Sequence, residues 1–171
     1  QVTIYEASDK LGGNMRLAAY PPGKGDITNM IRSYIVRCQK AGVTIKMNQE
    51  VTLDLIREEK PDSVIVASGS RTLILPIEGI DNPAIIHGSD LLDGKRAAGK
   101  KVLVVGGGMV GCETAAFLGE QNHDVTVIEF RDTVGADVIH EHRVYLMKDF
   151  EDYKIKEITG AKVCKFYEDG V

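Results

Sequence analysis

The sequence predicts an α/β fold built around a mostly parallel, doubly wound sheet. Short apolar strands alternate with helical segments along the whole chain. One of these strands leads directly into a glycine-rich turn and a helix. Two similar units occur, one at the start and one from residue 101, and strand–helix–strand units join parallel strands. We therefore expect a mostly parallel sheet with helices on both faces.

The first half of the chain has clear boundaries for one long helix. Asp26 is the expected N-cap of this helix, and Gly42 is its expected stop. The run 63–67 is uninterrupted and apolar, as in a strand buried on both faces. In order, we expect a strand at 1–6, a helix at 26–41, a strand at 43–47, a helix at 53–59 and a strand at 63–67.

The second half restarts the alternation after a stretch broken by Gly69, Pro76, Gly79 and Pro83. We expect a first α/β unit at 1–76, an inter-domain crossing at 77–96 and a second α/β domain at 97–171. The motifs and the resemblance described below imply that the first unit is a partial FAD-binding unit and that the second binds a nucleotide. The expected elements are helices at 89–93, 109–121 and 138–150, strands at 101–105, 124–129 and 153–158, and a strand or hairpin arm at 163–167.

The composition excludes several classes of protein. Of the 171 residues, 21 are Lys or Arg and 25 are Asp or Glu, so the formal charge is −4. This balance leaves no excess of basic residues for binding nucleic acid. No apolar run approaches the roughly 18 residues of a membrane span. The three cysteines form no C-x-x-C pair. We therefore expect no disulfide framework and no metal site, and a cytoplasmic location.

The strongest motif is Gly-Gly-Gly-Met-Val-Gly, which joins an expected strand to an expected helix. In that context a G-x-G-x-x-G turn binds the diphosphate of a dinucleotide. Gly106 permits the tight turn, Gly108 leaves room for a phosphate, and Gly111 lets the helix pack against the strand. The N–H groups of the turn then face the phosphates. The expected phosphate site, in a Rossmann-like domain, is Gly106, Gly107, Gly108, Met109, Val110 and Gly111.

An acid ends the next expected strand. Glu129 lies 18 residues after Gly111, about where a carboxylate accepts both ribose hydroxyls of an adenosine. Such a carboxylate would repel a 2′-phosphate and lose its hydroxyl partners, together worth about 2–4 kcal/mol. We therefore expect NAD(H) to be preferred over NADP(H). Arg131 could reach a 2′-phosphate, but beside Glu129 we expect it to stack near the adenine or to lie in solvent.

The opening strand repeats this pattern. Val-Thr-Ile-Tyr-Glu at 2–6 ends in an acid, as does Val-Thr-Val-Ile-Glu at 125–129. The matching glycine turn would lie about 20 residues earlier, before Gln1. We therefore expect the chain to be a fragment of a longer protein, with part of a first adenosine site and without its phosphate turn.

The chain resembles one protein family over essentially its whole length. The segments that carry the resemblance are 6–13, 17–24, 64–69 and 106–115. The sequence resembles the C-terminal, pyridine-nucleotide-disulfide-reductase-like region of NADH:flavin oxidoreductases, such as 2,4-dienoyl-CoA reductase and 2-enoate reductase. The resemblance implies an FAD domain into which an NAD domain is inserted. It also implies a preceding barrel with FMN and an iron–sulfur cluster, which would be the partner of this chain.

The resemblance assigns FAD-binding roles to five residues. Glu6 would bind the adenosine ribose of FAD, and Val51 would meet the adenine. Lys10, Gly12 and Gly13 would lie along the phosphates and the ribityl chain. Of these roles, only that of Glu6 is also suggested by the sequence pattern of the opening strand.

The resemblance also places Ala67 and Gly69 at the turn where the chain leaves the flavin domain. Glu113 would point at the nicotinamide, although an acid favoured by the helix dipole explains it equally well. In the whole enzyme, hydride would pass from NADH to FAD, and electrons would continue through the iron–sulfur cluster to FMN and an activated alkene such as an enoyl-CoA. The fragment alone would be inactive, and no residue in it is an expected acid, base or nucleophile.

Other residues suggest weaker alternatives. His140 and His142 could suggest a metal, but positions two apart on a helix point in different directions, so we expect a solvated face. Cys112 is expected to be a buried core residue rather than a redox thiol. The chain could instead be a stand-alone, non-catalytic dinucleotide-binding module, or the electron-input subunit of a glutamate-synthase-like reductase. Exposed apolar faces could also support a homo-oligomer.

Overall fold

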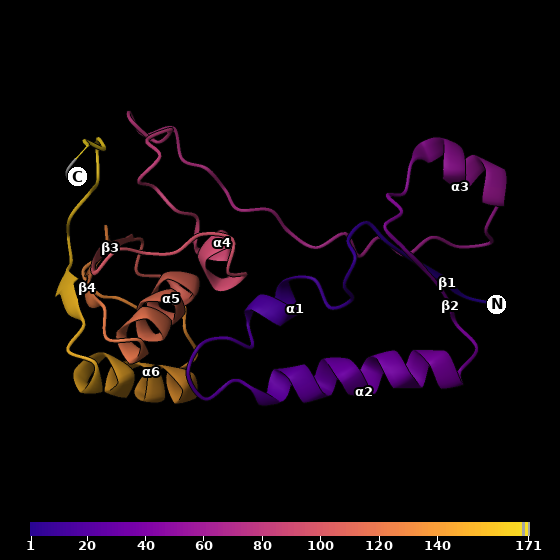
Figure 1. Cartoon of the computed structure of the whole chain (residues 1–171), viewed down its shortest axis with the longest axis horizontal. Coiled ribbons are helices and arrows are strands. Elements are labelled where there is room, and N and C mark those ends of the chain that lie inside the picture. The colour runs from indigo at the N-terminus through magenta and orange to yellow at the C-terminus, as the bar shows by residue number, and fades with distance from the viewer. Residues whose placement is uncertain (169, 171) are drawn as a thin grey trace. The chain divides into compact units, whose positions relative to one another are not determined.

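The computed structural model describes residues 1–168 and residue 170, which divide into two compact units (Figure 1). The first unit comprises residues 1–19 and 24–71. The second unit comprises residues 20–23 and the chain from residue 72 onward. Each unit contains its own parallel sheet.

The first unit has two strands joined by a long helix. Its elements are β1 (Thr3–Glu6), α1 (Asn14–Leu17), α2 (Asp26–Lys40), β2 (Thr44–Met47) and α3 (Leu53–Glu59). Strands β1 and β2 are parallel, with Thr3 opposite Thr44 and Glu6 opposite Met47. The prediction that α2 ends before Gly42 is confirmed, since Gly42 has φ +71°. The expected N-cap was wrong, because Gly25 caps α2 and Asp26 is its first residue.

The second unit contains a three-stranded parallel sheet in the order β3-β4-β5. Its elements are α4 (Gly88–Leu92), β3 (Lys101–Val105), α5 (Met109–Glu120), β4 (Asp124–Ile128), α6 (His140–Asp152) and β5 (Lys156–Ile158). Lys101 lies opposite Asp124, and Thr126 lies opposite Lys156. The predicted α/β fold class with parallel strands is therefore confirmed.

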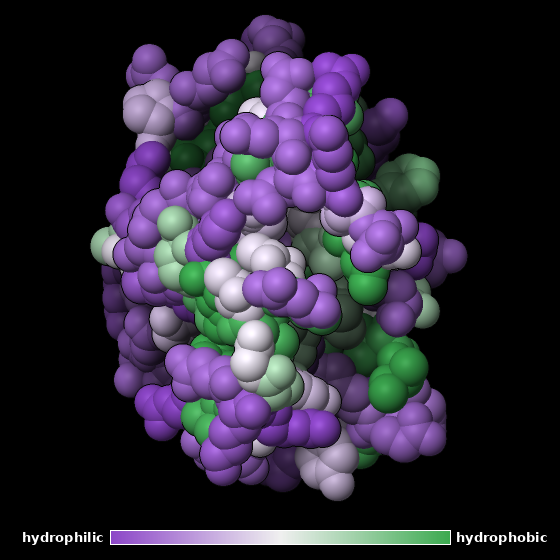
Figure 2. All heavy atoms as spheres, turned by 90° about the vertical axis from the view of Figure 1, so that its right-hand side faces the viewer, coloured by the Kyte–Doolittle hydropathy of each residue, from purple (hydrophilic) through white to green (hydrophobic). Residues whose placement is uncertain are grey.

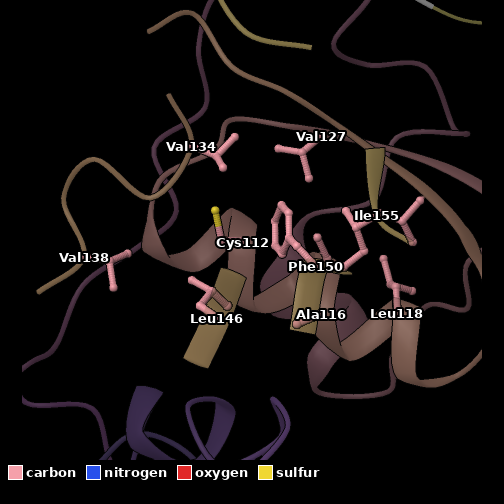
Figure 3. Packing of buried hydrophobic residues seen from close by; sticks show 11 residues of the cluster. Cys112, Ala116, Leu118, Val127, Val134, Val138, Leu146, Phe150 and Ile155 are labelled. Carbon is pink, nitrogen blue, oxygen red and sulfur yellow. The ribbon is translucent and has the colours of Figure 1, made fainter. Parts of the chain in front are cut away.

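The buried core lies in the second unit, where side chains from α5, α6, β4 and the segment 134–138 point toward one another (Figure 3). Helix α5 packs against β3, β4 and α6. Its small residues make this possible: a Cβ at Gly119 would lie 2.7 Å from the Cβ of Tyr153. Cys112, Ala115 and Ala116 are fully buried on the same helix. Dense packing of this kind fixes the position of the turn that precedes α5.

Three structural expectations were wrong. The run 63–67 forms no strand and is exposed, with Ile65 at 90%, because no strand of the described chain pairs with it. The strand expected at 153–158 begins only at Lys156, since α6 runs to Asp152 and Lys154 turns with φ +57°. Among the described residues, helices do not cover both faces of the β3-β4-β5 sheet: Leu103 and Val105 remain 45% and 42% exposed.

The remaining differences are small. Helix α1 lies where we expected none, and α6 begins at His140 rather than at residue 138. The segment 163–167 makes a single parallel bridge, between Lys165 and Glu78, instead of a strand. No helix within the described residues is long and apolar enough to cross a membrane.

The first unit has no buried side chain among its described residues. Its larger apolar residues reach the surface, as the hydrophobic side chains among hydrophilic ones show (Figure 2). Tyr34 and Val36 on α2 are 55% and 45% exposed. A two-stranded sheet with one long helix does not enclose a core of its own.

Candidate functional site

The glycine turn between β3 and α5 has the tight geometry that its sequence predicts. Gly106 has φ +103°, a conformation that L side chains rarely adopt, and its N–H donates to the carbonyl of Ile128 at 2.8 Å. A Cβ at Gly111 would lie 1.8 Å from the carbonyl oxygen of Gly106. Only glycine therefore allows α5 to begin this close to the turn.

Glu129 directly follows β4 and contacts the turn. Its Oε2 accepts the N–H of Gly107 at 2.5 Å, and its Oε1 accepts the N–H of Arg131 at 2.8 Å. A carboxylate has about four lone-pair sites. Each oxygen of Glu129 therefore keeps capacity for one more donor, which matches two neighbouring hydroxyls.

An open hollow of about 200 Å³ lies beside the turn. It is lined by Gly107, Gly108, Glu129, Arg131, Thr133, Ala136 and Asp137. The structure thus brings Arg131 to the same hollow as Glu129 and the glycine turn. Met109 and Val110, at the start of α5, are 43% and 63% exposed.

Sequence reasoning missed Asp137. Its Oδ1 accepts the N–H of Met109 at 2.9 Å, at the N-terminus of α5. Asp137 comes from the segment between β4 and α6, which carries no recognisable motif. Only the folding of that segment over the turn places this acid next to Gly108.

Glu113 does not face the hollow as a free acid. It is 7% exposed, and its Oε1 lies 3.0 Å from Nε2 of His142 on α6. The expectation that His142 lies on a solvated helix face was therefore wrong, because α6 packs against α5. His140 does lie on the exposed side of α6. No cluster of three metal-ligating side chains exists among the described residues.

Cys112 is a buried core residue, as expected. It is fully buried, and its Sγ contacts the carbonyl of Gly107 at 3.1 Å. Burial, with smaller contributions from nearby carboxylates, raises the pKa of the Cys112 thiol to about 11. The thiol is therefore protonated at neutral pH and unsuited to redox chemistry.

The residues expected to bind FAD gather at one end of the first sheet. Glu6 ends β1, and its Oε1 accepts both the N–H and the hydroxyl of Ser8 at 2.8 Å. The Ser8 hydroxyl also lies 2.8 Å from the carbonyl oxygen of Lys10, which is an alternative acceptor for its single proton. Gly12 and Gly13 follow with φ +108° and +46°.

The other expected FAD residues lie on loops of the same unit. Val51 follows β2 and is 44% exposed. Ala67 and Gly69 are exposed, and Gly69 has φ +72°. The side-chain amide of Asn14 donates to the hydroxyl of Ser70 at 2.9 Å, which ties this loop to α1.

The model of the pyridine nucleotide-disulphide oxidoreductase family matches residues 3–171. The chain belongs to this family. The glycine turn and Glu129 both lie within the matched residues.

Relatives of this oxidoreductase domain include two curated enzymes. A cinnamate reductase of Clostridium sporogenes is 32% identical over 173 residues, which cover 99% of this chain and 26% of the relative. An NADH oxidase of Thermoanaerobacter brockii is 33% identical over 176 residues, with 100% and 27% covered.

A solved structure of a 2-naphthoyl-CoA reductase in complex with 2-naphthoyl-CoA is 34% identical to this oxidoreductase domain. Its TM-score is 0.94, and the match covers 99% of this chain and 26% of that one. The chain therefore spans about a quarter of the length of the relatives that it matches.

Proposed function

We propose that the glycine turn and Glu129 bind NADH for a flavin-dependent reductase. The steric features support this fit: Gly106 makes the turn, and Gly111 brings the start of α5 against it. Backbone N–H groups at a helix N-terminus favour a diphosphate because of their positive partial charge. The observation that carries the proposal is the Glu129 carboxylate, which the N–H groups of Gly107 and Arg131 hold beside that turn.

Glu129 would also select the nucleotide. Its two remaining acceptor positions suit the two hydroxyls of an adenosine ribose. A 2′-phosphate would remove one hydroxyl and bring negative charge against the carboxylate. Arg131 lines the same hollow, but its neighbour Glu129 keeps the local charge unfavourable for a second phosphate. We therefore propose a preference for NAD(H) over NADP(H).

In the first unit we propose a partial FAD site. Glu6 would accept a ribose hydroxyl of the flavin nucleotide, since its position at the end of β1 resembles that of Glu129, which directly follows β4. Lys10, Gly12, Gly13 and Val51 lie on the loops that follow β1 and β2. Ala67 and Gly69 would form the exit turn, within an FAD-binding part at 1–76 and an NADH-binding part at 97–171.

When both nucleotides are bound, NADH supplies a hydride that the flavin accepts, and this chain binds and orients the two cofactors. We propose that a barrel with FMN and an iron–sulfur cluster, elsewhere in a cytoplasmic protein, receives the electrons and reduces an activated alkene such as an enoyl-CoA. The cinnamate and 2-naphthoyl-CoA reductases among the relatives support this substrate class.

Titration of the chain with NADH and NADPH by calorimetry tests the proposal. NADH should bind at least about tenfold more tightly, and Glu129→Gln should reduce this ratio because it removes the negative charge. Glu157→Gln, at an exposed position on β5, is the matched control and should leave the ratio unchanged. Equal affinities of the parent chain for the two nucleotides would refute the role of Glu129.

A further inference from the structure

Asp137 lies where the proposed diphosphate would bind. Its Oδ1 accepts the N–H of Met109 at 2.9 Å. A Cβ built on Gly108 would lie 3.2 Å from Oδ2 of Asp137. Both carboxylate oxygens therefore face the corner of the turn that a phosphate would approach.

The segment that carries Asp137 is anchored on both sides. Val134 and Val138 are 1% and 8% exposed and belong to the buried core. The N–H of Gly135 donates to the carbonyl of Gly107 at 2.6 Å. Nη2 of Arg143 donates to the hydroxyl of Thr133 at 3.0 Å and to the carbonyl of Val134 at 3.1 Å. The backbone near Asp137 is thus held against the turn, so a change in the contact with Met109 requires a rotation of the Asp137 side chain.

Asp137 and a diphosphate have competing needs at this position. The Met109 N–H points to one acceptor at a time, and a carboxylate is a strong, charge-assisted acceptor. A bound diphosphate would also place like charges within a few ångströms of Asp137, with Glu129 as a second nearby acid. Binding therefore requires the Asp137 side chain to leave the turn or to tolerate that repulsion.

We propose that Asp137 is an internal competitor that weakens dinucleotide binding at the glycine turn. The carboxylate caps α5 in the free protein, and the diphosphate displaces it. This inference rests on the proposed NADH site. Its consequence is a site that releases its nucleotide more readily than the glycine turn alone would allow.

Asp137→Asn tests this, because asparagine keeps the shape and one acceptor oxygen but loses the charge. We expect calorimetry on the full chain to show NADH bound more tightly by on the order of tenfold, with the same gain for ADP. Asp137→Ser removes the charge in a second way and should also tighten binding. Asp132→Asn, an exposed acid of the same segment, is the control and should change affinity by less than about twofold.

Adenosine, which carries no phosphate, should gain nothing from Asp137→Asn. Unchanged or weaker NADH binding by both Asp137 variants, or an equal gain for adenosine, would overturn the competitor role while leaving the NADH site intact. If the parent chain binds neither NADH nor ADP, the proposed function itself fails, and the competitor role fails with it.

Discussion

Glu6 is the last residue of β1 and Glu129 directly follows β4, and the two strands, one in each unit, have nearly identical sequence patterns. One oxygen of each carboxylate accepts the backbone N–H of the second residue after it, Ser8 or Arg131, at 2.8 Å. The other oxygen distinguishes them, because Glu129 also accepts the N–H of Gly107. The two hydrogen bonds described for Glu6 both come from Ser8. A strand that ends in an acid is thus a pattern of the local sequence. A dinucleotide site also needs a glycine turn after the neighbouring strand.

The burial of apolar side chains also differs between the two units. The hydrophobic core runs from Leu92 to Ile155, entirely within the second unit. The first unit has a parallel sheet and a long helix, but its described residues bury no side chain fully. Secondary structure with the right period therefore gives a core only where a third strand and a second helix cover it.

Hydrogen exchange of backbone amides should give the largest contrast between the units. Amides of α5 and β4 should exchange at least about a thousandfold more slowly than those of α2 and β2, because local opening is easiest where little apolar surface is buried. Mass spectrometry of the intact chain measures both sets in one sample. Equal protection in the two units would contradict the difference in burial.

Replacing one glycine in each unit by alanine compares how tightly the two units are packed. Gly111→Ala would place a Cβ 1.8 Å from the Gly106 carbonyl, and we expect it to cost about 3 kcal/mol or more in unfolding free energy and to abolish NADH binding. Gly25→Ala, beside α2, meets no atom within 4 Å and should change stability by less than about 1 kcal/mol. Urea denaturation measures both. A tolerated Gly111→Ala would show that α5 does not need to begin so close to the turn.

The three cysteines differ in burial, and their reactivity should follow that difference. Burial raises the pKa of Cys112 to about 11, so at pH 8 its thiolate fraction is on the order of 100-fold below that of an ordinary thiol. Iodoacetamide should modify the exposed Cys164 and the half-buried Cys38 first, as peptide mapping would show. Because the folded thiol keeps its proton longer, stability should fall as pH rises from about 8.5 toward 11. Labelling of Cys112 at the rate of Cys164 would contradict its burial.

The pair between Glu113 and His142 should give a smaller effect. His142→Ala removes a hydrogen-bond partner that lies 3.0 Å from the nearly buried Glu113 carboxylate, and we expect a loss of about 1–2 kcal/mol in unfolding free energy. His140→Ala, two residues earlier and exposed, should cost no more than about 0.5 kcal/mol. Thermal unfolding followed by circular dichroism measures the two variants side by side. Equal losses would mean that the contact between α5 and α6 does not depend on His142.

Much of the second unit was predictable. The strand at 101–105 leads into the glycine turn, the strand at 124–129 follows the next helix, and few other structures explain glycines at this spacing. The run 63–67 misled us, since apolar composition predicts burial only if partner strands exist. Pattern alone cannot supply those partners.

The site was predictable only in part. The turn and Glu129 follow from spacing, because both are fixed by local strand geometry. Asp137 and His142 reach the turn and α5 only through tertiary packing of the segment 130–152, which has no periodic signal at those positions. Contacts of this kind depend on the tertiary fold, and no sequence motif predicts them.

A structure of the chain with NADH bound tests the central claim most directly. The account predicts the diphosphate against the N–H groups at the start of α5, the adenosine ribose hydroxyls on Glu129, and the Asp137 side chain turned away from Met109. A cofactor bound elsewhere, or a diphosphate at the turn with Glu129 out of reach of the ribose, would contradict it.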